Sequence, residues 1–183
     1  MKNIHIAAAI IVSLGISALS FAEDMSPYGD SHKKDVKYQP VKIALNFSST
    51  PETAKADLAQ LAAVLKQMQN FLPKGSKISV VAIGGGIGVF AKENYLDLQA
   101  QMDTIAELSQ PTAAVPVDIT YCGNSMKGAG YTPADMEGFG EIVPGGYLEL
   151  ARLAGDGYMV TTISDYKTRG ARAELKNILS KSH

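Results

Sequence analysis

The chain has 183 residues, of which 46% are hydrophobic and 19% are charged, and its formal net charge is −1. A balance of 17 basic against 18 acidic side chains gives no indication of nucleic-acid binding. Only one cysteine is present, so no disulfide can form within a single chain.

The first 22 residues are predicted to be a secretory signal. Lys2 precedes an apolar run from Ile4 to Leu19, and residues 20–22 place small side chains at the positions that define a cleavage site. The apolar run is short for a membrane span. We therefore expect cleavage after Ala22 and a mature chain in the periplasm, with no membrane span and with one domain.

Residues 23–40 mix charge, proline, glycine and serine, and this composition predicts a flexible or extended arm. The ordered domain is expected at 41–164, and it begins with an alternating strand at 41–47. Thr50 and Pro51 then predict the start of a helix, as its cap and its first helical residue. The apolar face of that helix recurs at spacings of three and four: Leu58, Leu61, Ala62, Leu65, Met68 and Leu72.

A nearly continuous apolar strand at 78–83 is typical of a strand that is covered on both faces. The loop that follows this strand contains four glycines, Gly84, Gly85, Gly86 and Gly88. Residues 86–91 formally fit G-x-G-x-x-A, but they follow the second strand, and no acidic residue ends the next one, so dinucleotide binding is not favoured. We expect these glycines to let the backbone pass close to a neighbouring segment, a ligand anion or the loop of Cys122.

Helices and strands continue to alternate after this loop. The expected elements are a helix at 93–108, a strand at 115–121, a short helix from Thr132, a brief strand at 142–143, a helix at 147–154 and a strand at 158–163. This alternation predicts an α/β domain with a mostly parallel sheet and helices on both faces. Residues 165–183 form a basic tail, which is predicted to be helical because Ala171, Leu175, Ile178 and Leu179 line one side. Such a helix either packs on the domain with its charged side in solvent or serves as a partner-binding appendage.

Cys122 follows the predicted strand at 115–121 and precedes a probable helix, at the end of the sheet where α/β proteins place functional residues. Backbone N–H groups at the helix start, with Lys127 about one turn away, favour a thiolate. The structural alternative is a buried cysteine that serves as a small apolar filler. An idle exposed thiol is a liability in an oxidising compartment, and this consideration favours a functional role.

None of the three histidines lies in the predicted domain, since His5 is in the signal, His32 in the arm and His183 at the end. A Cys-His dyad is therefore not expected, and no metal site or cofactor is predicted. What remains is a single thiol beside Asn124, Ser125 and Lys127. Such a group can carry sulfur as a persulfide, form a mixed disulfide or bind a ligand.

Residues 122–127, CGNSMK, resemble the C-x-N-[ST]-[LM]-[KR] segment of the DsrE/DsrF-like family. Residues 130–136 resemble the short helix that follows this cysteine in the family. Residues 142–158 resemble its closing V-P-x-G-x-x-E-L…E-G-Y stretch. The resemblance spans about residues 41–163, with the motifs in the family's order.

This resemblance implies a flavodoxin-like, three-layer α/β/α fold that assembles into trimers or hexamers. It also implies sulfur relay or sulfur binding, with Cys122 as the sulfur-accepting thiol and Asn124 and Lys127 as its local support. Two features depart from the family. Gly84 and Gly85 stand where many relatives have a histidine, and this chain is predicted to be exported, which does not fit the RNA thiolation of cytoplasmic relatives.

The sequence thus predicts a periplasmic sulfur carrier or sulfurtransferase. Cys122 would accept sulfane sulfur from a donor protein or a small sulfur compound and pass it to an acceptor. The alternative is a non-catalytic, oligomeric module that binds a small ligand or a partner and keeps Cys122 as a structural residue. In a third interpretation, Cys122 forms a disulfide between two chains.

Overall fold

The computed structural model describes residues 37–163. The predicted signal, most of the predicted arm and the predicted tail at 165–183 lie outside the described residues. Residues 37–40, the end of the arm, are exposed and form neither helix nor strand. Within the described part, every helix is too short or too polar to cross a membrane.

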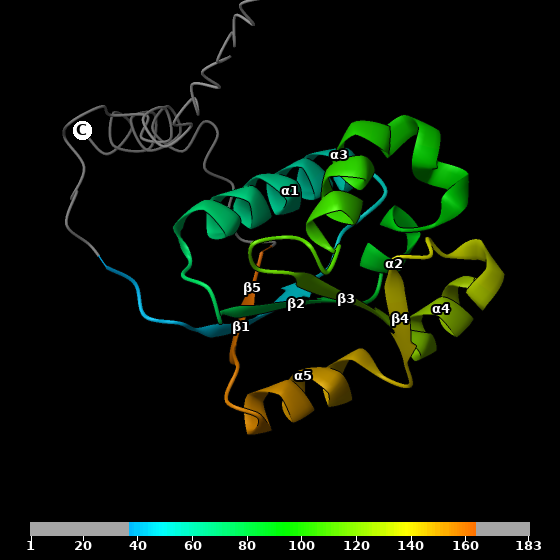
Figure 1. Cartoon of the computed structure of the whole chain (residues 1–183). Helices are drawn as coiled ribbons and strands as arrows, with labels where there is room; N and C mark the ends of the chain where they lie inside the picture. Colours follow the sequence, from blue (N-terminus) through cyan, green and yellow to red (C-terminus); the bar gives the residue numbers. More distant parts are fainter. Residues whose placement is uncertain (1–36, 164–183) are drawn as a thin grey trace, which may run out of the picture. The chain divides into compact units, whose positions relative to one another are not determined.

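A five-stranded sheet forms the centre of the domain (Figure 1). Its strands are β1 (Lys42–Phe47), β2 (Lys77–Ala82), β3 (Val117–Cys122), β4 (Gly140–Val143) and β5 (Met159–Thr162). The order across the sheet is β4-β3-β2-β1-β5, and all neighbouring strands pair in parallel. The expected parallel sheet is confirmed, and the carboxyl ends of all five strands therefore lie on the same side of the domain.

Helices cover both faces of this sheet. Figure 1 shows α1 (Ala54–Phe71) and α3 (Tyr95–Leu108) packed together on one face and α5 (Gly146–Gly155) on the other. The expected three-layer α/β/α arrangement is confirmed. Four shorter helical segments complete the domain: α2 (Gly86–Val89), η2 (Lys92–Asn94), α4 (Gly123–Ala129) and η3 (Pro133–Asp135).

The core follows the predicted apolar patterns. The first four predicted positions of α1 are buried, and Met68 and Leu72 are partly buried and pack against the core. Five of the six residues of β2 are buried, as expected for a central strand. At the carboxyl ends of the strands, the ring of Phe90 lies 5.7 Å from that of Phe47 and 5.6 Å from that of Tyr121. These contacts fix the loop after β2 against the ends of β1 and β3.

Two segments differ from the prediction by more than one or two residues. Helix α1 begins at Ala54 with Thr53 as its cap, and residues 51–53 form a turn. The carboxylate of Asp57 explains this later start, because it accepts hydrogen bonds from the hydroxyls of Ser49 (2.7 Å) and Thr53 (2.6 Å). The second difference is α2, which occupies part of the glycine loop. Its four residues are too few to show a helical repeat in the sequence.

Candidate functional site

Cys122 is the last residue of β3 and also the residue that caps α4. The chain passes from strand to helix at this position without a connecting loop. The thiol therefore lies at the carboxyl end of a central strand, beside the first backbone N–H groups of α4. This is the location that the sequence predicted for it.

A second helix, α5, begins beside the same thiol. The backbone N–H of Gly146, the first residue of α5, donates a hydrogen bond of 3.1 Å to Cys122 Sγ. A Cβ atom at residue 146 would lie 2.5 Å from Ile83 Cγ1 and 3.1 Å from Cys122 Cβ. Only glycine allows this approach, so the start of α5 is held directly against the thiol.

Ser125 links the thiol to the loop after β2. Its hydroxyl donates a hydrogen bond to the Cys122 sulfur and accepts one of 2.9 Å from the backbone N–H of Gly84. The N–H of Asn124 donates to the carbonyl of Pro144 at 3.2 Å, which ties α4 to the turn before α5. The start of α4, the turn before α5 and the loop after β2 are therefore tied together beside the sulfur.

Burial raises the pKa of the Cys122 thiol, but hydrogen bonds to the sulfur have the opposite and larger combined effect. They come from the Ser125 hydroxyl and from the backbone N–H groups of Gly146, Ser125 and Asn124. Each donor stabilises the charged form, so the pKa of Cys122 lies below its ordinary value. The site therefore favours a thiolate, as the sequence predicted, but with more donors than the sequence indicated.

Cys122 is one of the residues that line a pocket of about 300 Å³. Cys122 is only 4% exposed, whereas Tyr147 and Leu148 at the rim are each 72% exposed. The eight residues that line the pocket carry no formal charge: Ile83, Cys122, Asn124, Ser125, Gly145, Gly146, Tyr147 and Leu148. The sulfur is thus buried within the protein but borders a small opening with an apolar rim.

Of the predicted supporting residues, Asn124 and Ser125 line this pocket and Lys127 does not. Lys127 is exposed in the last turn of α4. The predicted glycine loop lies close to the thiol without lining its pocket, and Gly84 reaches the thiol through Ser125.

The other glycines of this loop serve packing. A Cβ atom at Gly85 would lie 2.1 Å from the carbonyl oxygen of Ser49, and one at Gly86 would lie 2.6 Å from that of Phe47. These distances show the close backbone approach that the glycines were expected to permit. Gly88 is less constrained, since a Cβ atom there would lie 3.4 Å from the nearest atom.

Five pocket residues were not predicted from the sequence: Ile83, Gly145, Gly146, Tyr147 and Leu148. A usable signal was present, because residues 144–146, Pro-Gly-Gly, lead from a predicted strand into a predicted helix. In a parallel sheet, such a helix begins at the carboxyl ends of the strands, which is the end where Cys122 lies.

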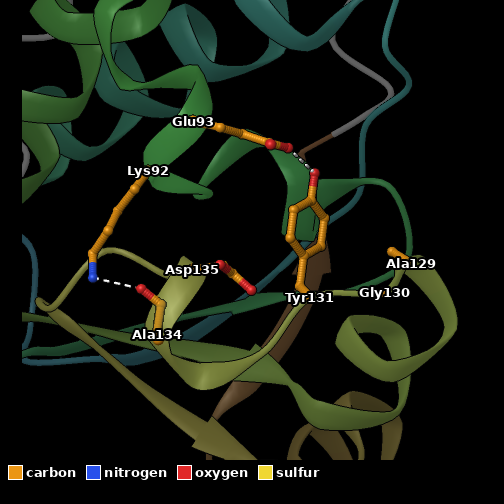
Figure 2. A pocket seen from close by; sticks show the side chains of 7 residues that line it. All are labelled: Lys92, Glu93, Ala129, Gly130, Tyr131, Ala134 and Asp135. Carbon is orange, nitrogen blue, oxygen red and sulfur yellow. Dashed lines mark hydrogen bonds between the residues drawn. The ribbon is translucent and has the colours of Figure 1, made fainter.

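A separate hollow of about 430 Å³ lies beside η2 and η3 (Figure 2). Its polar groups bond one another: Tyr131 Oη donates to Glu93 at 2.8 Å, and Lys92 Nζ donates to the carbonyl of Ala134 at 2.7 Å. The carboxylate of Asp135 accepts hydrogen bonds from Thr132. These side chains are therefore occupied in holding the two loops together.

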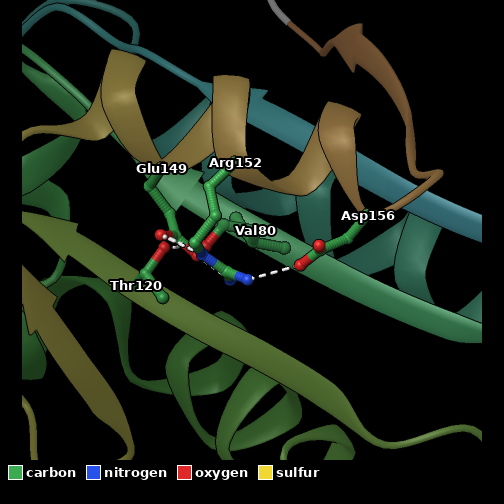
Figure 3. A network of polar contacts seen from close by, with 5 residues as sticks. All are labelled: Val80, Thr120, Glu149, Arg152 and Asp156. Carbon is green, nitrogen blue, oxygen red and sulfur yellow. Dashed lines mark hydrogen bonds and ion pairs between the residues drawn. The ribbon is translucent and has the colours of Figure 1, made fainter.

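On α5, Arg152 forms ion pairs with Glu149 and Asp156, and the Thr120 hydroxyl beneath the helix donates to the carbonyl of Val80 (Figure 3). The ion pairs join residues of α5 and its C-cap to one another, and the Thr120 bond joins β3 to β2 within the sheet. Among residues 37–163, no three histidine, cysteine, aspartate or glutamate side chains lie close enough together to hold a metal ion.

The sequence profile of the DsrE/DsrF-like family matches residues 41–162. The fold is similar to that of MTH1491, a protein of unknown function from Methanobacterium thermoautotrophicum, with 15% identity and a TM-score of 0.52. It is also similar to the ychN protein from E. coli, with 18% identity and a TM-score of 0.44. Each comparison covers 68% of this chain and 99% of the other chain. No curated protein matches the sequence.

Proposed function

Because the chain belongs to the DsrE/DsrF-like family, we propose that it handles sulfur, accepting sulfane sulfur on Cys122 as a persulfide and passing it to an acceptor. Family membership suggests a role in sulfur relay. The observation that best supports Cys122 in this role is the 3.1 Å hydrogen bond from the backbone N–H of Gly146 to its sulfur, together with the hydrogen bond from Ser125. The predicted signal supports a periplasmic site of action.

The first step is attack by the Cys122 thiolate on a sulfane sulfur of a polysulfide. One S–S bond forms between Cys122 and that sulfur, and the bond from it to the rest of the polysulfide breaks. The shortened polysulfide leaves with the electron pair, so no external oxidant is required. The lowered pKa of Cys122 supports this step because the thiolate is the nucleophile.

In the second step, the Cys122 sulfur is the leaving group and no longer the nucleophile. An acceptor thiolate attacks the outer sulfur of the persulfide, and the Cys122 thiolate leaves with the electron pair. A thiol with a lower pKa leaves faster. The donors that favour the thiolate for attack, chiefly Ser125 and Gly146, therefore also favour its departure.

The pocket supports a small sulfur compound as one donor, since its volume of about 300 Å³ borders the thiol directly. Protein donors and acceptors are equally part of the proposal, with sulfur exchanged at the exposed rim of Tyr147 and Leu148. Assembly into trimers or hexamers is proposed from the family resemblance.

Intact-mass spectrometry tests the proposal. The full chain incubated with polysulfide should gain the mass of one sulfur atom and lose it again when a thiol acceptor is added. Cys122→Ser is a clean control because it removes the only thiol in the chain. Lack of added sulfur on the wild-type protein, or equal addition to the serine variant, would refute the role of Cys122.

The competing function is a non-catalytic binding module with a structural cysteine, and the 4% exposure of Cys122 favours it. That function predicts very slow alkylation of the native thiol and no effect of Cys122→Ser on ligand or subunit binding. Fast alkylation by a small reagent would count against it. A disulfide between two chains would be seen by non-reducing electrophoresis.

A further inference from the structure

Strand β5 is the least covered strand of the sheet. It pairs with β1 on one side, and within residues 37–163 no strand pairs with its other side. Met159 is 62% exposed and Val160 is 41% exposed. The four residues of the strand, MVTT, include no charge, proline or glycine, the usual features that protect an edge strand from association. An apolar edge of this kind requires a cover.

The sequence supplies a segment of suitable pattern directly after this strand. Twenty residues, 164–183, follow Ile163. Their apolar positions, Ala171, Leu175, Ile178 and Leu179, have the i, i+4, i+7, i+8 spacing of one helical face. Each of the four earlier strands is also followed by a helical segment before the next strand.

We propose that residues 164–183 dock on β5 as an amphipathic helix that runs antiparallel to the strand and covers Met159. The dimensions agree. From Ile163 back to Met159 the strand spans about 13 Å, and a helix covers this distance in about nine residues. After a turn of three residues, 164–166, the ninth helical residue is Leu175, and its apolar side chain is the one that reaches Met159. Of the basic side chains, those at 169, 176 and 181 then point away from this apolar face.

A second copy of the chain is the competing occupant of β5. The tail has the advantage because it is attached to the strand that it covers. A tethered segment acts at an effective concentration of about millimolar or above, which a free second copy does not reach at ordinary protein concentrations.

Disulfide trapping in the full chain tests the proposal. In a Cys122→Ser background, Met159→Cys is combined with Leu175→Cys, and the matched control combines it with Lys176→Cys. Neighbouring helical positions point in directions about 100° apart, and a disulfide needs Cα atoms within about 7 Å. Mild oxidation should therefore link 159 to 175 within one chain and leave the 159/176 pair reduced.

Three results would overturn the proposal. They are equal linkage of both pairs, which indicates an undocked tail; linkage between two chains on non-reducing electrophoresis, which indicates a second copy; and no linkage at 175. A further variant keeps the test independent of the cysteines. Leu175→Glu should increase amide hydrogen exchange in β5, whereas Lys176→Glu should leave it unchanged, and the same exchange in both variants also contradicts docking.

Discussion

Replacing Ser125 by alanine should reduce the thiolate content of Cys122. The hydroxyl of Ser125 is the strongest of the donors that lower the pKa of this thiol. A hydrogen bond to a charged group contributes about 1.5–3 kcal/mol, and about 1.4 kcal/mol corresponds to a tenfold change in an equilibrium. Because Ser125 is partly exposed, water replaces some of the lost bond. We therefore expect about a tenfold smaller thiolate fraction below the pKa, the lower end of this range.

The assay is alkylation by excess iodoacetamide, followed from pH 5 to pH 10. Every alkylation event reports on Cys122, since the chain has no other cysteine. In Ser125→Ala the midpoint of the rate profile should move to higher pH. The midpoint is preferred to the rate at one pH because the more basic thiolate is also intrinsically more nucleophilic.

Ser125→Thr is the matched control, since it keeps a hydroxyl at this position of α4. Its midpoint should stay near that of the wild type. Thermal unfolding of both variants checks that loss of the Gly84 contact leaves the fold intact. An unchanged midpoint in the alanine variant, or equal displacement in both variants, would show that Ser125 does not set the charge state of the thiol.

Further outcomes follow from the packing and the charges. Gly85→Ala should destabilise the fold by about 1–3 kcal/mol, because its Cβ would lie 2.1 Å from a backbone oxygen. Gly128→Ala, with open space around it inside α4, should stabilise the fold by up to about 1 kcal/mol; urea unfolding of both variants checks the contrast. The depressed pKa of Cys122 adds stability that is complete above about pH 8.5, the unfolded value, and is lost as pH falls through the folded pKa. The free energies of unfolding of wild type and Cys122→Ser should therefore differ more at pH 8.5 than at pH 6. The same difference at both pH values would contradict the lowered pKa. Arg152 holds the pKa of Glu149 low, which adds stability above the unfolded value of about 4.3 that is lost as pH falls through the folded pKa. Acid unfolding of Arg152→Met should consequently show a weaker pH dependence below that value, and an identical dependence would exclude the contribution of the pair.

The layers of the fold could be predicted from the sequence because they follow from local periodicity. The buried face of α1 recurs at three- and four-residue spacings, and β2 is apolar almost throughout. Both patterns depend only on residues close together in the chain. Cys122 could also be located, because the end of a strand and the start of a helix are local features.

The environment of the thiol could be predicted only in part, because it depends on contacts between distant segments. Gly146 lies 24 residues after Cys122 in the chain, and Gly84 lies 41 residues before Ser125. Lys127, which sequence proximity favoured, does not line the pocket. Lys127, one helical turn after Cys122, is therefore a poorer guide to the surroundings of the thiol than Gly146, the first residue of α5.

Cys122 can be buried and still ionise because hydrogen-bond donors of the protein surround its sulfur. A thiol in purely apolar packing has a raised pKa, since desolvation disfavours the charged form. Here the hydrogen bonds from Ser125, Gly146 and Asn124 outweigh that effect. Cys122 is only 4% exposed, and the other residues that line its pocket carry no formal charge. The small pocket limits the size of the molecules that can reach the thiol, and the hydrogen bonds favour its thiolate form. Both properties suit the proposed persulfide carrier.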